Sequence, residues 1–189
     1  MSRAAWTPRR AVDADVPELE ELIALSVRGL HGPHYTQEQI DASIGTVFGV
    51  DRQLIEDGTY FVLEQGGRMV GCGGWSRRAS LCGSDSLRTG RDPEVDPGTE
   101  PARVRAFFVH PDWVRRGIGS AIMALCEREI RAAGFGQVAI MATLPGVPLY
   151  ASFGYRETGR FAVPMPGGLK IETVRMEKAL LGRPVQAKE

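Results

Sequence analysis

The stretch "RVRAFFVHPDWVRRGIGSAIM", residues 103–123, changes its pattern halfway along. Its first half is rich in β-branched and aromatic residues and stops at Pro111, which is typical of a strand that a proline ends. Its second half begins Arg-Arg-Gly-Ile-Gly-Ser and continues with apolar residues at helical spacing. The stretch therefore predicts a strand over 103–110, a glycine-containing turn, and a helix over about 118–133.

The predicted helix is amphipathic. Its apolar face is formed by Ile118, Ile122, Cys126, Ile130 and Ala133. The residues expected to face away from the core are Glu127, Arg128 and Arg131. Gly134 is expected to cap the C-terminal end.

The turn before this helix combines features that suit a phosphate group. A helix N-terminus leaves about four backbone amides without an intrahelical acceptor, and the helix dipole adds about half a positive charge there. Gly117 and Gly119 let the backbone turn tightly and let an anion approach the amides. Arg115 and Arg116 add positive charge. Taken alone, these residues fit a phosphate cradle and a plain strand-to-helix turn equally well.

Spacing excludes two common phosphate-binding loops. A Rossmann dinucleotide loop needs a third glycine three residues after Gly119, where this chain has Ile122. A Walker A loop needs Gly-Lys-Ser/Thr, which does not occur in the sequence. A phosphorylated ligand at this turn is therefore of another kind.

Length and composition are those of a soluble globular domain. The 189 residues suit one compact domain, and we expect a single domain over residues 1–189. The formal net charge is +0 from 23 basic and 23 acidic side chains, which argues against nucleic acid and membrane surfaces as partners. The sequence has no run of 18 apolar residues and no apolar signal-peptide core near residue 1. We therefore expect a cytoplasmic protein.

The three cysteines, Cys72, Cys82 and Cys126, are odd in number and lack CxxC spacing. This pattern argues against a disulfide framework and against a zinc site, so we expect no bound metal. An acyl-cysteine step at Cys72 or Cys82 is the less favoured alternative, because no histidine or carboxylate is visibly paired with either residue.

Capping residues mark the other helices. Asp13 is expected to cap a first helix that Gly29 ends. Thr36 and Gln39 form a capping box that opens a second helix. Short helical pieces are expected at "DRQLIED" and "PLYASF".

Alternating and β-rich runs predict the strands, and a glycine turn joins two of them in a hairpin. In chain order, the expected strands are residues 6–10, 59–64, 68–75, 103–110, 137–142, 157–163 and 170–177. Hairpins and one strand–helix–strand crossover together indicate a mixed α/β (α+β) domain.

Residues 76–102 lack a regular pattern and are rich in proline, glycine and acidic residues, so we expect a long surface loop. Its acidic residues are Asp85, Asp92, Glu94, Asp96 and Glu100. They either attract a cationic amine or form a solvated, mobile loop, and the second interpretation is favoured.

Residues 105–135, together with the later "YASFGY", resemble the GNAT superfamily of acyl-CoA-dependent N-acyltransferases. The family's cofactor loop has the pattern Gln/Arg-x-x-Gly-x-Gly/Ala and follows a strand that ends in Val-x-Pro. Here Val109-His110-Pro111 matches the strand end and Gly117-Ile118-Gly119 matches the glycines, while Val114 departs from the first loop position. The resemblance implies a central, mostly antiparallel mixed sheet with splayed strands flanked by helices.

The resemblance also implies acetyl-CoA as a co-substrate, bound mainly by residues 103–155. Its pantetheine arm is expected on the main chain of Phe108 and Val109, whose amides also polarise the thioester carbonyl. Its diphosphate is expected on the turn, formed by Arg115, Arg116, Gly117, Ile118, Gly119 and Ser120.

Tyr150 in "LYASFGY" stands where many family members have a tyrosine next to the CoA sulfur. A thiol with a pKa near ~8.5 leaves more readily when a neutral phenol donates a proton to it. The implied activity is transfer of acetyl from acetyl-CoA to the primary amine of a small molecule or a peptide, by direct attack in a ternary complex. The alternative function is that of a non-catalytic, acyl-CoA-binding regulatory module. Because family members often form homodimers, a homodimer is a possible assembly.

The sequence does not single out the base that removes a proton from the incoming amine. The candidates are His110, Glu64 and Asp112. His31 and His34 flank a Gly-Pro turn and either line the acceptor pocket or are solvated, and the second interpretation is favoured. Thr143 stands where the family often has an asparagine, so a contact made by that asparagine is not expected here.

Overall fold

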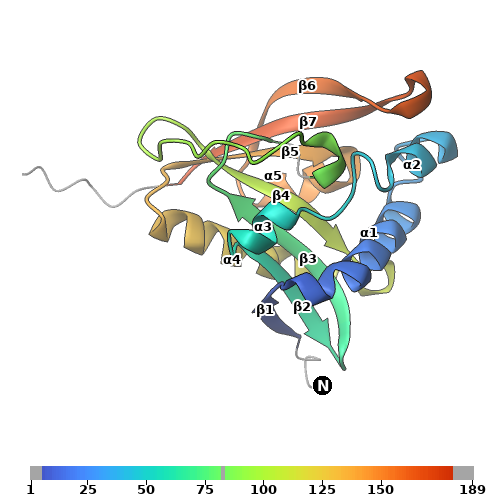
Figure 1. Ribbon diagram of the computed structural model, residues 1–189, viewed down its shortest axis with the longest axis horizontal. Coiled ribbons are helices and arrows are strands. Elements are labelled where there is room, and N and C mark those ends of the chain that lie inside the picture. Colours follow the sequence, from blue (N-terminus) through green and yellow to red (C-terminus); the bar gives the residue numbers. More distant parts are fainter. Residues whose placement is uncertain (1–5, 82–83, 181–189) are drawn as a thin grey trace, which may run out of the picture.

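Seven strands form one sheet in the computed structural model, which describes residues 6–81 and 84–180 (Figure 1). The strands are β1 (Thr7–Arg10), β2 (Tyr60–Gln65), β3 (Arg68–Ser76), β4 (Ala102–Val109), β5 (Gln137–Thr143), β6 (Arg156–Pro164) and β7 (Lys170–Ala179). They lie in the order β1-β2-β3-β4-β5-β7-β6. β4 and β5 run parallel, and the other neighbouring pairs run antiparallel. The predicted mixed, mostly antiparallel sheet is confirmed.

Helices cover both faces of the sheet. They are α1 (Val16–Leu30), α2 (Gln37–Ser43), α3 (Arg52–Glu56), α4 (Ile118–Ala132) and α5 (Val147–Ser152). Short 3₁₀ turns are η1 (Asp13–Asp15), η2 (Asp85–Leu87), η3 (Pro111–Trp113), η4 (Leu144–Gly146) and η5 (Pro166–Gly168). α1 and α3 lie in front of the sheet in Figure 1, and α4 and α5 lie behind it.

The two faces bury separate hydrophobic clusters. α1 contributes Leu19, Ile23 and Val27 to one cluster, together with residues of β2 and β3. α4 contributes Ile122 and Ile130 to the other. The sheet is therefore the middle layer of three. Because helices cover both of its faces, a ligand can enter between the layers only where two strands separate.

α4 follows the sequence prediction closely, with two exceptions. Gly134 has a φ of +88° just beyond the helix, as expected of a C-terminal glycine. Ala133 is exposed, which contradicts its predicted place on the apolar face. Glu127 is buried, which contradicts its predicted place facing away. Its carboxylate is paired with Lys178 at 2.7 Å and with Arg131 at 3.1 Å, and these cations compensate its burial.

The start and end of α1 differ from the prediction. Asp13 lies in η1, and it is Asp15 whose carboxylate accepts a hydrogen bond, at 2.8 Å, from the amide of Val12. Gly29 lies inside the last turn of the helix rather than after it. A Cβ at Gly29 would collide with the ring of Pro111, so this glycine allows close packing instead of ending the helix.

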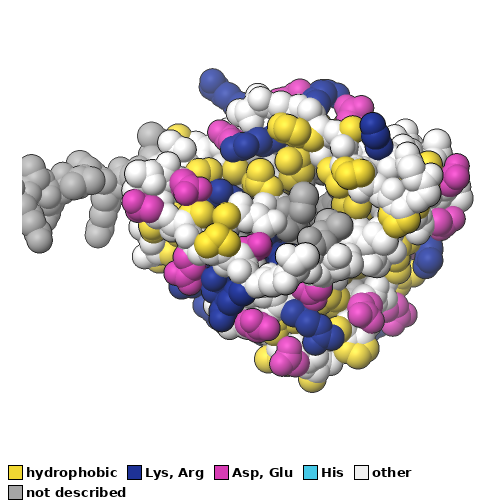
Figure 2. Space-filling view, turned by 45° about the horizontal axis from the view of Figure 1, so that its top comes forward, with side chains coloured by type: hydrophobic (Ala, Val, Ile, Leu, Met, Phe, Trp, Pro, Cys, Tyr) yellow, Lys and Arg dark blue, Asp and Glu magenta, His cyan; other side chains and the backbone are white. Residues whose placement is uncertain are grey.

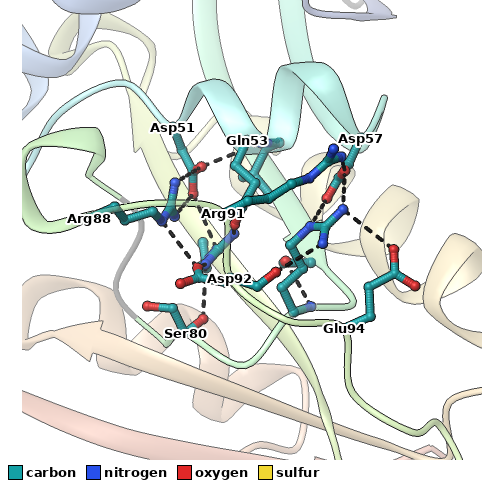
Figure 3. Close-up of polar contacts among 12 residues, drawn as sticks. Asp51, Gln53, Asp57, Ser80, Arg88, Arg91, Asp92 and Glu94 are labelled. Atoms are coloured by element: carbon teal, nitrogen blue, oxygen red, sulfur yellow. Dashed lines mark hydrogen bonds and ion pairs between the residues drawn. The ribbon is translucent and has the colours of Figure 1, made fainter.

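The segment between β3 and β4 is the predicted long loop, and ion pairs tie it to α3 and the residues around it (Figure 3). Arg78 pairs with Asp57 at 2.7 Å, and Arg88 pairs with Asp51 at 2.7 Å. The loop acids Asp85, Asp92, Glu94 and Glu100 also pair with arginines of the chain. These four carboxylates thus have partners within the protein, which argues against an acidic attractant for an amine. Glu94, Asp96 and Glu100 are nevertheless exposed, as expected of a solvated loop.

Candidate active site

β4 and β5 separate soon after they pair. Their parallel register runs from Ala102 opposite Val138 to Val104 opposite Ile140 and stops there. Beyond that point the edges of the two strands face a gap, as the resemblance implied. A cavity of about 80 Å³ lies at this gap, lined by both strands and by Tyr150.

A β-bulge in β4 borders the gap. The register between β3 and β4 shifts, so that Ala106 and Phe107 together lie opposite Gly73. Ala106 has a φ of +51°, and its carbonyl accepts a hydrogen bond, at 3.2 Å, from the buried hydroxyl of Tyr60. Bulges often redirect a strand next to an active site. Here the bulge turns the end of β4 away from β5.

The main chain of Val109, rather than that of Phe108, is directed at the gap. The amide of His110 donates to the carbonyl of Val70 in β3. Because main-chain groups alternate in direction along a strand, those of Phe108 also point to β3, and those of Val109 point the other way. The Phe108 side chain packs against Phe48, with 6.1 Å between ring centroids, and lines the cavity. Of the two predicted pantetheine contacts, only Val109 has its main chain free for the role.

Tyr150 lies on α5 at the inner end of the gap. Its ring packs edge-to-face on Phe107, with centroids 5.9 Å apart. A Cβ at Gly146 would lie 2.9 Å from this ring, so the glycine leaves the space that the ring occupies. Burial raises the pKa of Tyr150 above its usual value, and the phenol stays neutral. Among the described residues its hydroxyl has no hydrogen-bond partner, which leaves it available as a donor.

The predicted phosphate turn has a backbone that presents amides outward. Arg115 and Gly117 both have positive φ, of +63° and +85°, and α4 starts directly after Gly117. The first helical hydrogen bond runs from the amide of Ala121 to the carbonyl of Gly117. The amides of Ile118, Gly119 and Ser120 therefore have no intrahelical acceptor. This arrangement fits a diphosphate.

The side chains of the turn have different roles. Arg115 and Arg116 are exposed, and the Arg116 guanidinium lies 4.5 Å from the centre of the Trp113 ring. Ile118 is buried under the sheet-facing side of α4, so only its amide can reach a ligand. A Cβ at Gly119 would lie 3.0 Å from Leu149, so this glycine lets α4 and α5 pack closely.

The described lining of the cavity includes none of the candidate bases and neither of the two histidines considered for the acceptor pocket. The Nδ1 atom of His110 accepts a hydrogen bond from the amide of Asp112, so His110 caps η3. Burial lowers the pKa of His31 to about 4, and its ring packs between Tyr35 and Phe48. Glu64 pairs with Arg9 at 2.9 Å, at the β1 edge of the sheet.

Three further candidates, Asp112, His34 and the cysteine nucleophile, also fit poorly. Asp112 is 86% exposed, and His34 is exposed in the turn after α1. Cys72 is buried against Tyr60, and burial raises the pKa of its thiol to about 12, so it is not a nucleophile at neutral pH. Cys82 lies outside the described residues.

Sequence reasoning missed Phe107 and Arg105 as cavity residues. Phe107 stacks on Tyr150, and Arg105 lines the cavity with its side chain fully buried. Both stand in a run of residues that predicts a plain strand. The bulge at Ala106 and Phe107 places Phe107 against Tyr150 and Arg105 among buried carboxylates, and no pattern in the sequence predicts this bulge.

The chain belongs to the GNAT acetyltransferase family. The family described as "Acetyltransferase (GNAT) domain" matches residues 56–157, which is more than half of the chain and includes β2 to β5, α4 and α5. No curated protein matches the chain. The resemblance found from the sequence is thereby confirmed. The matched segment includes the turn, Val109 and Tyr150, whereas part of the cavity lining lies outside it.

Solved structures share the fold at low sequence identity. A GCN5-related N-acetyltransferase from Rhodopseudomonas palustris matches with a TM-score of 0.69 and 20% identity, over 95% of this chain and 99% of that one. YncA from Salmonella typhimurium, solved with its cofactor acetyl-CoA, has a TM-score of 0.62 and 17% identity, over 95% and 96% of the two chains. The ribosomal-protein-S18-alanine N-acetyltransferase from Escherichia coli has a TM-score of 0.59 and 15% identity, over 98% and 99%.

No helix in residues 6–81 and 84–180 is long and apolar enough to cross a membrane. Within the same ranges, no three side chains of His, Cys, Asp or Glu are grouped so as to hold a metal ion.

Proposed function

We propose that the protein transfers acetyl from acetyl-CoA to a primary amine, by direct attack of the amine within a ternary complex. One observation carries the proposal: β4 and β5 part beside a cavity that Tyr150 lines, and Gly119 of the amide-rich turn lies against Phe107, which lines the same cavity. A donor held by the turn and an acceptor in the cavity would thus meet at the gap.

The residues present fit the diphosphate and pantetheine parts of acetyl-CoA. The amides of Ile118, Gly119 and Ser120 offer donors at a helix N-terminus, and a Cβ at Gly117 would meet no neighbouring atom, so the turn is open to a ligand. Arg115 and Arg116 add positive charge at the surface. The free main chain of Val109 offers a hydrogen-bonding edge to an extended arm.

Bound acetyl-CoA supplies a thioester whose carbonyl carbon accepts the amine nitrogen. The Val109 amide, directed at the gap, would polarise the carbonyl oxygen as negative charge develops there. Tyr150 would donate its hydroxyl proton to the sulfur as the C–S bond breaks. The proton lost by the nitrogen balances the one gained by the sulfur, so Tyr150 ends the cycle protonated.

A regulatory module that only binds acyl-CoA would need the turn but not the cavity. The cavity therefore favours the enzyme. The neutral, unpartnered hydroxyl of Tyr150 at its wall favours it too, because a binding module has no use for a proton donor there.

Release of free CoA from acetyl-CoA, measured with a thiol reagent across a panel of primary amines, tests the proposal. The expected result is release that depends on both the amine and the enzyme, with the N-acetyl product identified by mass. Tight binding of CoA without turnover on any amine would instead establish the binding module.

A further inference from the structure

The cavity at the gap has an uncharged acceptor side. Its described apolar lining on this side comes from segments far apart in the chain, namely Val47, Phe48, Leu81, Met141 and Val163. Hydroxyl groups come from Ser84, Thr143 and Thr173. No described lining residue carries a carboxylate or an imidazole. Figure 2 shows one face of the molecule, on which hydrophobic side chains gather around the centre and charged side chains lie among and outside them.

Arg105 is the charged residue among the described lining, and its charge is already compensated. Its guanidinium lies 3.2 Å from Asp51 and 3.5 Å from Asp92, and it donates to the carbonyl of Ser80 at 3.0 Å. Asp51 and Asp92 also pair with Arg88, as Figure 3 shows. Neither carboxylate is left over for a ligand, because each already faces two guanidinium groups.

A protonated amine is poorly matched to such a cavity. It would lose its hydration and find no counter-charge, and desolvation without a partner disfavours the charged form of an amine. It would also find no base among the described lining to take the proton that must leave before attack. An alkyl amine with a lysine-like pKa near ~10.4 is almost entirely protonated at pH 7, whereas an aryl amine is already neutral.

We propose that the acceptor is an apolar, weakly basic primary amine of the aryl amine type, one that enters the cavity uncharged. This inference rests on the proposed N-acetyltransferase function. The neutral nitrogen forms the new C–N bond, the C–S bond breaks, and Tyr150 protonates the sulfur. The proton released by the nitrogen then restores Tyr150, so no proton passes to solvent and no further base is required.

Aniline and benzylamine test the inference, because both carry a phenyl ring and differ in basicity. With the full-length protein and saturating acetyl-CoA at pH 7, kcat/KM for aniline is expected to exceed that for benzylamine by about 10-fold or more. A smaller preference, or a preference for benzylamine, overturns the inference.

A pair of variants gives an independent readout. Val47 is half-buried, lies between α2 and α3, and lines the cavity. Val47→Asp supplies the missing counter-charge and is expected to shift the aniline-to-benzylamine ratio about 10-fold toward benzylamine. Val47→Asn introduces a side chain of the same shape as aspartate but without its charge, and is expected to leave the aniline-to-benzylamine ratio unchanged. Equal shifts in the two variants contradict the electrostatic argument.

The wider panel separates failure of this inference from failure of the proposed function. If spermidine, an amino acid or a peptide amine supports CoA release and aniline does not, N-acetyl transfer stands and the neutral-acceptor inference is wrong. If no amine in the panel supports release, the proposed function itself is wrong.

Discussion

The two sides of the gap between β4 and β5, the turn proposed to hold the donor and the cavity proposed to hold the acceptor, are formed by different parts of the chain. The donor side is a single turn, continuous in sequence, that offers main-chain amides and exposed arginines. The acceptor side is assembled from side chains of several distant segments, and buried ion pairs hold its walls. Substitutions on the donor side should thus act mainly through backbone conformation, and those on the acceptor side through side-chain chemistry.

Breaking the buried ion pairs is expected to have the largest effect. Asp51→Asn removes a charge that faces both Arg88 and Arg105, whose side chains are 9% and 0% exposed. Unpaired buried charges are costly, so the free energy of unfolding should fall by about 3 kcal/mol in chemical denaturation. Asp96→Asn is the control, because Asp96 is exposed and, among the described residues, its carboxylate accepts only from the nearby amide of Gly98. Equal losses in both variants would show that the pairs do not hold the loop.

Removing the Tyr150 hydroxyl comes next in size. Tyr150→Phe should lower kcat about 100-fold, the lower range for loss of a general acid, because the departing sulfur loses its donor. The dissociation constant for CoA, measured by calorimetry, should change less than about 2-fold. Tyr155→Phe is the matched control, since Tyr155 is equally buried but does not line the cavity. An unchanged kcat in Tyr150→Phe removes this residue from the chemistry.

On the donor side, a substitution that restricts the backbone should weaken CoA binding more than a substitution that removes a charge. Gly117 has a φ of +85°, and an alanine there is strained by about 1–2 kcal/mol. Gly117→Ala is therefore expected to weaken CoA binding about 10-fold through the altered turn. Gly32→Ala, at a glycine with open space and no positive φ, should bind CoA normally. Normal binding by both variants would mean that the left-handed turn is not required.

The smallest effect is expected from an arginine of the turn. Arg115 is exposed, so its attraction to a diphosphate is screened by solvent and salt. Arg115→Ala should weaken CoA binding about 3-fold at low ionic strength and hardly at all in 0.5 M salt. A loss that persists at high salt would indicate a direct, buried contact instead.

The elements around the turn could be predicted from the sequence because their signals are local, and the role of the turn as the donor site remains a prediction. The strand end, the glycines and the periodicity of α4 lie within one stretch, and each expected strand appears within about two residues of its place. The family resemblance came from the same stretch. Departures occurred where a distant residue decides the outcome, as when Lys178 compensates the buried Glu127 or Pro111 packs on Gly29.

The acceptor side could not be predicted, because its parts meet only in three dimensions. Arg105 and Asp51 are far apart in sequence, and neither residue alone indicates a buried pair. The bulge at Ala106 is anchored by Tyr60 from another strand. Tyr150 is the exception, since it belongs to a motif that the family resemblance identifies, and its role remains a prediction.

The contact between Gly119 and Leu149 has a consequence for the evolution of this chain. Gly119 belongs to the donor turn, and Leu149 immediately precedes Tyr150, so one point of packing joins the two. A larger residue at position 119 requires the Leu149 side chain to shift unless position 149 becomes smaller. The two positions are therefore expected to change together among relatives, with glycine at 119 accompanying a bulky neighbour at 149.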